Sequence, residues 1–135
     1  MSAHEIILPD GWPRPSGYSN GIAARGRIVA VAGQIGWNPV TLKFDSVELV
    51  DQVRTTLSNV VAVLRAAGAT PEHVIRMTWY ITDRDAYVAN TKRIGEVYRE
   101  VFGRVYPALA VVVVAGLIEA QALVEIEATA VVPDH

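Results

Sequence analysis

The sequence predicts an α+β fold, a sandwich in which a mixed sheet of about six strands carries two helices on one face. Two stretches with helical periodicity alternate with short runs rich in β-branched residues. Two of these runs, Arg27–Ile35 and residues 109–117, are apolar at nearly every position and need cover on both sides. Two helices shield about one face of such a sheet, and monomers avoid large exposed apolar patches. We therefore expect the other face to be buried against further copies of the chain.

Composition limits the classes of function. The 135 residues suit a single domain, residues 1–135, that opens with an extended, proline-rich segment at residues 1–16. A net charge of −2 gives no electrostatic reason to expect nucleic acid or an anionic membrane as a partner. The absence of cysteine excludes disulfides, thiol nucleophiles and thiolate metal sites. No signal peptide is visible, and the longest apolar run, residues 108–118, is about half a membrane span, so we expect a cytoplasmic protein.

The first half of the chain predicts a hairpin followed by a helix. Residues 18–24 and Arg27–Ile35 have the composition of two strands that turn at Arg25 and Gly26, and a loop follows at residues 36–39. Apolar residues then recur at spacings of three and four, which predicts a helix over residues 47–64.

Residues beside this helix predict its two ends. Asp45 and Glu48 resemble a capping box, and Gly68 supplies the stop. Residues 73–82 are rich in β-branched and aromatic residues, so we expect a strand there.

The second half predicts one more helix and two strands. The helix starts at about Asp83 and ends at Gly103. Residues 109–117 then form a buried strand, and a short connection at 118–121 leads to the last strand, residues 122–132.

Several short patterns carry little weight. Residues 17–21 fit G-x-S-x-G, the nucleophile elbow of serine hydrolases, but a strand follows where the elbow requires a helix. We interpret the pattern as a turn or the start of a strand. His4, His73 and His135 lack the spacing of metal ligands, and no phosphate-binding glycine motif is present. We expect neither a metal nor another cofactor.

Two glutamates on the last strand are the main candidate site. Glu125 and Glu127 are two residues apart, so they share one face, about 6.6 Å apart along the strand. They belong either to a solvated face paired with basic residues, or to a subunit junction where one of them handles a water or a polar ligand. Similarly, Gly33 and Gln34 indicate either a β-bulge or a close approach of a ligand to the backbone.

Six short motifs resemble one family when they are taken together, in this order and spacing. They are Gly17-Tyr18-Ser19, Ala32-Gly33-Gln34, residues 59–68 (NVVAVLRAAG), Thr82-Asp83, Tyr106-Pro107-Ala108 and residues 123–128 (LVEIEA). The chain is identified as a member of the RidA family, also called YjgF or endoribonuclease L-PSP-like. The likeness covers residues 18–132, nearly the whole chain.

This resemblance implies a chorismate-mutase-like homotrimer with helices outside, sheets facing inward and small-molecule clefts between subunits. Typical members hydrolyse reactive enamines or imines to keto acids and ammonia. In those members an arginine after the Pro-Ala pair binds the substrate carboxylate, while a glutamate on the last strand helps to position water. By position, the resemblance implies Glu125 as the catalytic residue and the following substrate-binding residues: Tyr18, Ala32, Gly33, Leu109 and Val111.

Leu109 stands where the family has its arginine, and Ala32 stands where it has a serine. A lost charge-assisted contact is worth about 2–4 kcal/mol, or roughly 30- to 1000-fold in carboxylate affinity. Arg27, Arg76 or Arg104 would have to supply the missing cation.

Two functions therefore stay open. One is an enamine or imine deaminase, for example of the aminomuconate type, in which Glu125 orients water. The other is a non-catalytic trimeric module that binds a ligand or a partner. A ribonuclease, as some family names suggest, fits poorly with the acidic charge balance and the lack of a histidine pair.

Overall fold

The computed structural model describes residues 3–134. Within this range the chain forms six strands in two sheets and three α-helices, which confirms the predicted α+β class. The helices are α1 (Leu49–Ala66), α2 (Arg84–Ala89) and α3 (Thr91–Phe102), with a 3₁₀ helix, η1 (Pro71–His73), before β4. The strands are β1 (Glu5–Ile7), β2 (Gly21–Ala23), β3 (Arg27–Ile35), β4 (Val74–Ile81), β5 (Ala108–Val113) and β6 (Val124–Val132).

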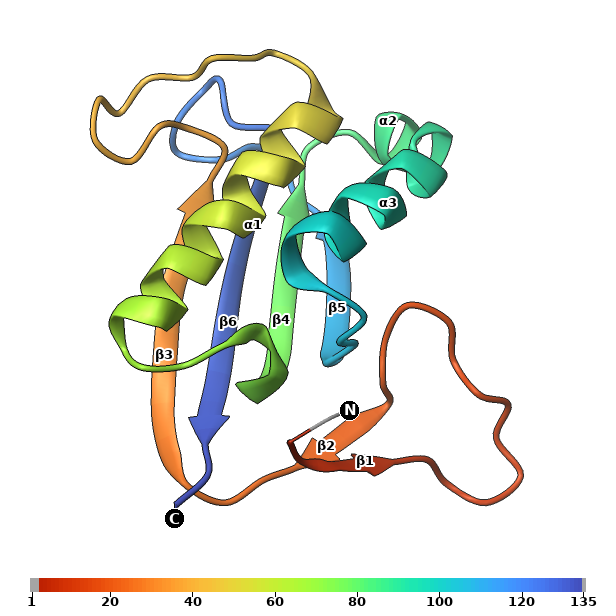
Figure 1. Ribbon diagram of the computed structural model, residues 1–135. Helices are drawn as coiled ribbons and strands as arrows, with labels where there is room; N and C mark the ends of the chain where they lie inside the picture. The colour runs from red at the N-terminus through yellow and green to blue at the C-terminus, as the bar shows by residue number, and fades with distance from the viewer. Residues whose placement is uncertain (1–2, 135) are drawn as a thin grey trace.

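The larger sheet has four strands in the order β3-β6-β4-β5. β6 is antiparallel to both β3 and β4, and β5 pairs with β4 in parallel. Figure 1 shows α1 and α3 lying across one face of this sheet, which we call the covered face. In the part of the chain that is described, no helix packs on the opposite face, which we call the open face.

The hydrophobic core lies between the covered face and the helices. α1 contributes residues at helical spacing, and alternate residues of β4 and β6 point toward them, as their burial shows. Each fully buried side chain of this kind stabilises the fold by roughly 1.5–3 kcal/mol. The most deeply buried members are Val53, Leu57, Val60 and Leu64 of α1, Met77 and Ile81 of β4, and Val124 and Ile126 of β6.

One buried amide joins the start of α1 to the loop before β6. The Nε2 of Gln52 donates to the carbonyl oxygens of Ser46 at 3.1 Å and Gln121 at 2.9 Å. The backbone N–H of Leu123 donates to Gln52 Oε1 at 2.8 Å. Because a buried amide requires such partners, these bonds fix where β6 begins and therefore where Glu125 lies.

The predicted hairpin between residues 18–24 and 27–35 is wrong. β2 pairs with β1, whereas β3 pairs with β6. Ser19 supplies the physical reason: its N–H donates to the carbonyl of Pro107 at 3.0 Å and its hydroxyl to the carbonyl of Tyr106 at 2.5 Å. These bonds hold the segment before β2 at the start of β5, the sheet edge opposite to β3.

The second predicted helix is divided into α2 and α3. Asn90 lies between them, its Nδ2 donating to the carbonyl of Ala86 at 2.8 Å while its own carbonyl accepts from Ile94 at 2.9 Å. Asn90 thus ends one helix and begins the next. Gly103, with φ of 84°, follows the end of α3 as predicted.

The predicted capping box of Asp45 and Glu48 does not form. Glu48 is the N-cap of α1 but makes no side-chain capping bond. Instead, the hydroxyl of Ser46 accepts from the N–H of Glu48 at 3.0 Å and donates to Asp51 at 2.8 Å. At the other end, Gly68 has φ of +75° and follows the helix as predicted.

The strand predicted as buried over residues 109–117 is shorter and lies at an edge. β5 ends at Val113, and the N–H of Val114 donates to the carbonyl of Ile81 at 2.9 Å beyond it. Its side chains are half-buried or exposed because, among the described strands, β4 alone pairs with it. An apolar sequence suits this edge because one side of β5 lines a cavity.

Candidate functional site

Glu125 and Glu127 both point to the open face, as their spacing predicts. The residues between and beside them are buried on the covered face. The hydroxyl of Tyr80 donates to Glu127 Oε2 at 2.8 Å, and this bond to a carboxylate raises the pKa of Tyr80. Glu125 accepts no hydrogen bond and forms no ion pair within residues 3–134. Of the two glutamates, Glu125 is therefore the one whose carboxylate is not bonded to another described side chain.

A β-bulge lies directly against Glu125. The register between β3 and β6 shifts between Val31 and Gln34, which leaves Ala32 and Gly33 as the bulged residues. A Cβ added to Gly33 would lie 2.6 Å from Glu125 Oε2. The bulge interpretation of this glycine is thus confirmed, and the same geometry brings its backbone to the carboxylate. We call Ala32, Gly33 and Glu125 the Glu125 cluster.

The other predicted residues lie around a cavity of about 430 Å³ between β5 and α3, which we call the β5–α3 cavity. Leu109 and Val111 line it from β5, beside their buried strand partners Met77 and Trp79. Its remaining walls are largely aromatic, and Arg99 is the only charged residue among the described residues that line it. The aromatic members are Tyr18, Trp79, Tyr87, Tyr98 and Tyr106.

The bonds of Ser19 place Tyr18 in this cavity. Because they tie the segment to Tyr106 and Pro107, Tyr18 stands at the start of β5 and is 42% exposed. The hydroxyl of Ser19 donates to the carbonyl of Tyr106, and Ser19 is buried. The G-x-S-x-G pattern is therefore a structural turn before β2, where Gly17 has φ of +83°.

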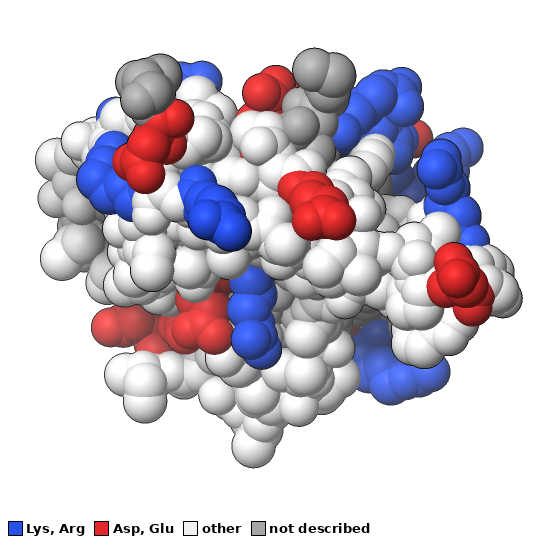
Figure 2. Space-filling model, turned by 90° about the horizontal axis from the view of Figure 1, so that it is seen from below, with Lys and Arg blue, Asp and Glu red and all other residues white. Residues whose placement is uncertain are grey.

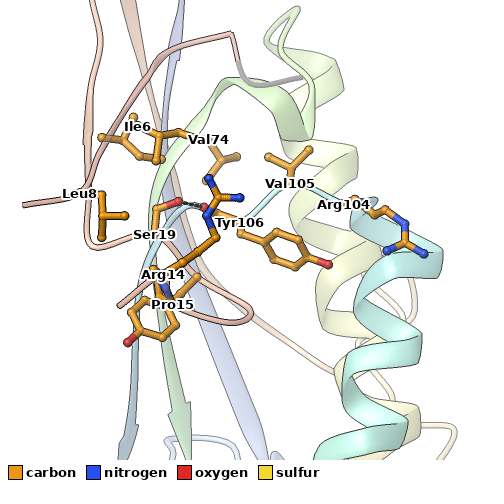
Figure 3. Close-up of a pocket in the computed structure, with 11 residues that line it drawn as sticks. Ile6, Leu8, Arg14, Pro15, Ser19, Val74, Arg104, Val105 and Tyr106 are labelled. Carbon is orange, nitrogen blue, oxygen red and sulfur yellow. Dashed lines mark hydrogen bonds between the residues drawn. The ribbon is translucent and has the colours of Figure 1, made fainter. Parts of the chain in front are cut away.

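A second cavity of about 280 Å³ adjoins the first and shares Tyr18 and Tyr106 with it. It contains Arg14 and Arg104 (Figure 3). Figure 3 shows the guanidinium of Arg14 amid the side chains that line this cavity, whereas Arg104 extends away from them.

None of the three arginines expected to replace the family arginine lines the β5–α3 cavity. Arg27 donates to the carbonyl of Ala67 at 2.7 Å, at the C-terminal end of α1. Arg76 lies on β4 and Arg104 lines the adjoining cavity. The cation that the sequence reasoning missed is Arg99. Its spacing of four residues from Gly95 places both on one face of α3, but only the fold shows that this face meets β5.

The predicted site residues thus form two groups on opposite faces of one sheet. The Glu125 cluster belongs to the open face, while Leu109 and Val111 lie on the side of the buried Trp79. The sheet separates the groups, so one small ligand cannot contact both groups of the same chain.

Within residues 3–134, neither the face seen in Figure 2 nor the metal-ligating residues indicate another site. On the face seen in Figure 2, acidic and basic side chains are interspersed rather than gathered by sign. Residues 3–134 contain no group of three or more His, Asp or Glu placed to hold a metal ion. In the same range, no helix combines the length and the hydropathy needed to cross a membrane.

The endoribonuclease L-PSP family matches residues 13–132. A RutC family protein of Pyrococcus horikoshii is 38% identical over 127 residues, covering 93% of this chain and 96% of its own. A protein of Dermatophagoides farinae named 2-iminobutanoate/2-iminopropanoate deaminase is 32% identical, covering 98% of this chain and 99% of its own.

A solved structure agrees with these sequence matches. The Rid-family protein YyfB from Yersinia pestis superposes with a TM-score of 0.83 at 31% identity, covering 96% of this chain and 98% of its own. The chain therefore belongs to the endoribonuclease L-PSP family, also called RidA or YjgF, as the motifs predicted.

Proposed function

We propose that this protein is a cytoplasmic homotrimer that hydrolyses a C–N bond of a small enamine or imine in clefts between its subunits. One observation carries the proposal. Glu125, without a hydrogen-bonding partner among residues 3–134, lies against the backbone of a bulge on the open face. A carboxylate beside accessible main-chain groups is suited to bind and deprotonate a water molecule.

The division of the site between two faces supports the oligomer. If neighbouring subunits meet across the open face, one contributes the β5–α3 cavity with Tyr18 and Leu109, and the other contributes Gly33 and Glu125. The open face offers apolar surface for this contact, including Ile28, which is 71% exposed, and Val112, which is 40% exposed.

The chemistry requires one water and no cofactor. Glu125 takes a proton from water as the oxygen attacks the imine carbon, which gives a carbinolamine. Glu125 returns this proton to nitrogen. A second proton then passes from the new hydroxyl to nitrogen by way of Glu125 as the C–N bond breaks, so that a carbonyl compound and ammonia leave. The name of the Dermatophagoides farinae relative, a deaminase of two imino acids, supports this reaction class.

Leu109 favours a second candidate, a trimeric module that binds a ligand without turning it over. A leucine can neither donate to a carboxylate nor stabilise developing charge. Such a protein would keep the apolar cavity and lose the reaction.

Ammonia release from freshly generated imines separates the two candidates. We expect Glu125→Ala to lower turnover by about 10²- to 10⁴-fold, the usual effect of losing a general base. Glu127→Ala is the matched control, since it removes the same group two residues away on the same face, and it should retain activity. Gly33→Ala should also reduce turnover, because its methyl group displaces the Glu125 carboxylate. Unchanged activity of Glu125→Ala contradicts the catalytic role, and saturable binding without turnover in the parent favours the module.

The oligomer has its own test. Ala30 is exposed on β3 of the open face, and Ala62 is exposed on the outer side of α1. Ala30→Glu should convert the trimer to smaller species in light scattering because it buries a charge in the contact, whereas Ala62→Glu should not. A parent protein that is monomeric at micromolar concentration contradicts the proposal.

A further inference from the structure

We infer that the β5–α3 cavity binds a small aromatic monocarboxylate and that Arg99, from α3, holds its carboxylate. This inference rests on the proposed function only in taking this cavity as half of the cleft. It adds the class of ligand, and it assigns to Arg99 the positive charge that Leu109 lacks.

Arg99 lies in the cavity wall beside Gly95. Its Nη1 lies 3.3 Å from the point that a Cβ on Gly95 would occupy, so the guanidinium extends back along α3 over the glycine. This places it in the wall of the cavity together with Thr91, about two turns earlier on α3, and Tyr87 of α2. Glycine at position 95 leaves the space that the guanidinium fills.

Among the described residues that line the cavity, Arg99 has no counter-ion. The side chain of Arg99 forms no ion pair or hydrogen bond within residues 3–134, and none of the described residues lining the cavity is acidic. Arg99 is exposed, so water solvates its charge, and its planar fork at the cavity wall stays available to a carboxylate. A single cation also favours a monocarboxylate over a dicarboxylate such as an aminomuconate.

An unpartnered donor gives independent support. Trp79 lines the same cavity and is 3% exposed, yet its buried Nε1–H has no hydrogen-bond partner within the described residues. Buried donors are normally paired, and this one would gain a partner from a ligand acceptor once the cavity wall opens enough to uncover it. The nearby hydroxyl of Tyr98 is not available, because it donates to the carbonyl of Val105.

The walls define the rest of the ligand. Tyr18 and Tyr87 present aromatic surface, and Leu109 and Val111 present aliphatic surface from β5. Burial raises the pKa of Tyr87, so its hydroxyl stays protonated and can donate at neutral pH. A cavity of about 430 Å³ accommodates one ring with a short acidic substituent.

Calorimetric titration with three probes tests the inference: phenylacetate, benzyl alcohol as the neutral aromatic, and acetate as the acid without a ring. We expect phenylacetate to bind the parent most tightly. Arg99→Ala should weaken phenylacetate by about 10- to 100-fold and leave benzyl alcohol unchanged. Arg104→Ala, in the adjoining cavity, is the matched control and should change neither. Leu109→Arg in the Arg99→Ala background should restore part of the affinity.

Gly95→Ala provides a variant that should not impair folding. It improves helix propensity while its methyl group meets the guanidinium, so phenylacetate should bind several-fold more weakly. Equal phenylacetate affinity in the parent and Arg99→Ala, or no phenylacetate binding to the parent at millimolar concentration, overturns the inference.

The outcomes separate this inference from the proposed function. Arg99-dependent binding in a protein whose Glu125→Ala variant behaves like the parent supports the carboxylate site and refutes the deaminase. Glu125-dependent turnover whose KM is unchanged in Arg99→Ala supports the deaminase and refutes the carboxylate site.

Discussion

The two faces of the four-stranded sheet differ although the same strands build both. On β6, Ile126 is fully buried under α1 while Glu127, the next residue, is exposed and bonded to Tyr80. The covered face obtains its stability from close packing, whereas the open face carries polar groups that bond to one another or, like Glu125, to no other described residue. Alternation of side chains thus assigns stability to one face and leaves the other free for recognition.

The largest expected effect is on the covered face. Ile126→Ala should lower the free energy of unfolding by about 2–5 kcal/mol, because it removes buried contacts and leaves a cavity. Thr129→Ala, on the open face of the same strand, should lower it by about 1 kcal/mol or less. Urea denaturation followed by circular dichroism measures both. Similar losses at the two positions would mean that the open face is packed as tightly as the core.

Alkaline unfolding should also distinguish the faces. The pKa of Tyr98 is raised chiefly by burial, whereas that of Tyr80 is raised chiefly by its bond to Glu127. With a raised pKa the folded state keeps its proton longer, so the stability is complete below the unfolded value of about 10 and falls as pH rises above it.

The expected slope for Tyr98 is about 1.4 kcal/mol of unfolding free energy per pH unit above pH 10. Tyr98→Phe should remove that part of the decline, although it also loses the bond to the carbonyl of Val105 at every pH. Tyr80→Phe should change the slope less, because Tyr80 lies on the open face rather than in the core of the chain. Denaturation curves between pH 8 and about 12 provide the measurement. An identical slope in the parent and Tyr98→Phe would contradict burial as the cause.

Features that depend on local periodicity could be predicted from the sequence. The spacing of Glu125 and Glu127 fixes their common face, and the apolar spacing of α1 fixes the side that it buries. Gly68 and Gly103 follow the ends of α1 and α3 with a positive φ, which glycine adopts without steric strain.

Features that depend on distant contacts could not be predicted. Ser19 bonds to Tyr106, 87 residues away, and this contact redirects β2 away from β3. Similarly, the pattern of each strand shows which residues alternate, but not that Leu109 and Glu125 take opposite faces of the assembled sheet. The role of Arg99 could not be predicted for the same reason. A cation on a helix indicates a binding site only when the residues packed around it are known.

The smallest expected effect lies outside both faces, on the solvent side of the helices. Arg54 of α1 donates through Nε to Glu100 of α3 at 2.9 Å, and this bond raises the pKa of Arg54. The two side chains are 45% and 60% exposed, so water and salt screen the pair.

Glu100→Gln should lower the unfolding free energy by about 0.2–1 kcal/mol in dilute buffer. The loss should shrink at 1 M salt, where the Debye length falls to about 3 Å. Glu96→Gln, an exposed glutamate of α3, is the control. A larger loss that persists in salt would show that the helices depend on charge as well as on packing against the covered face.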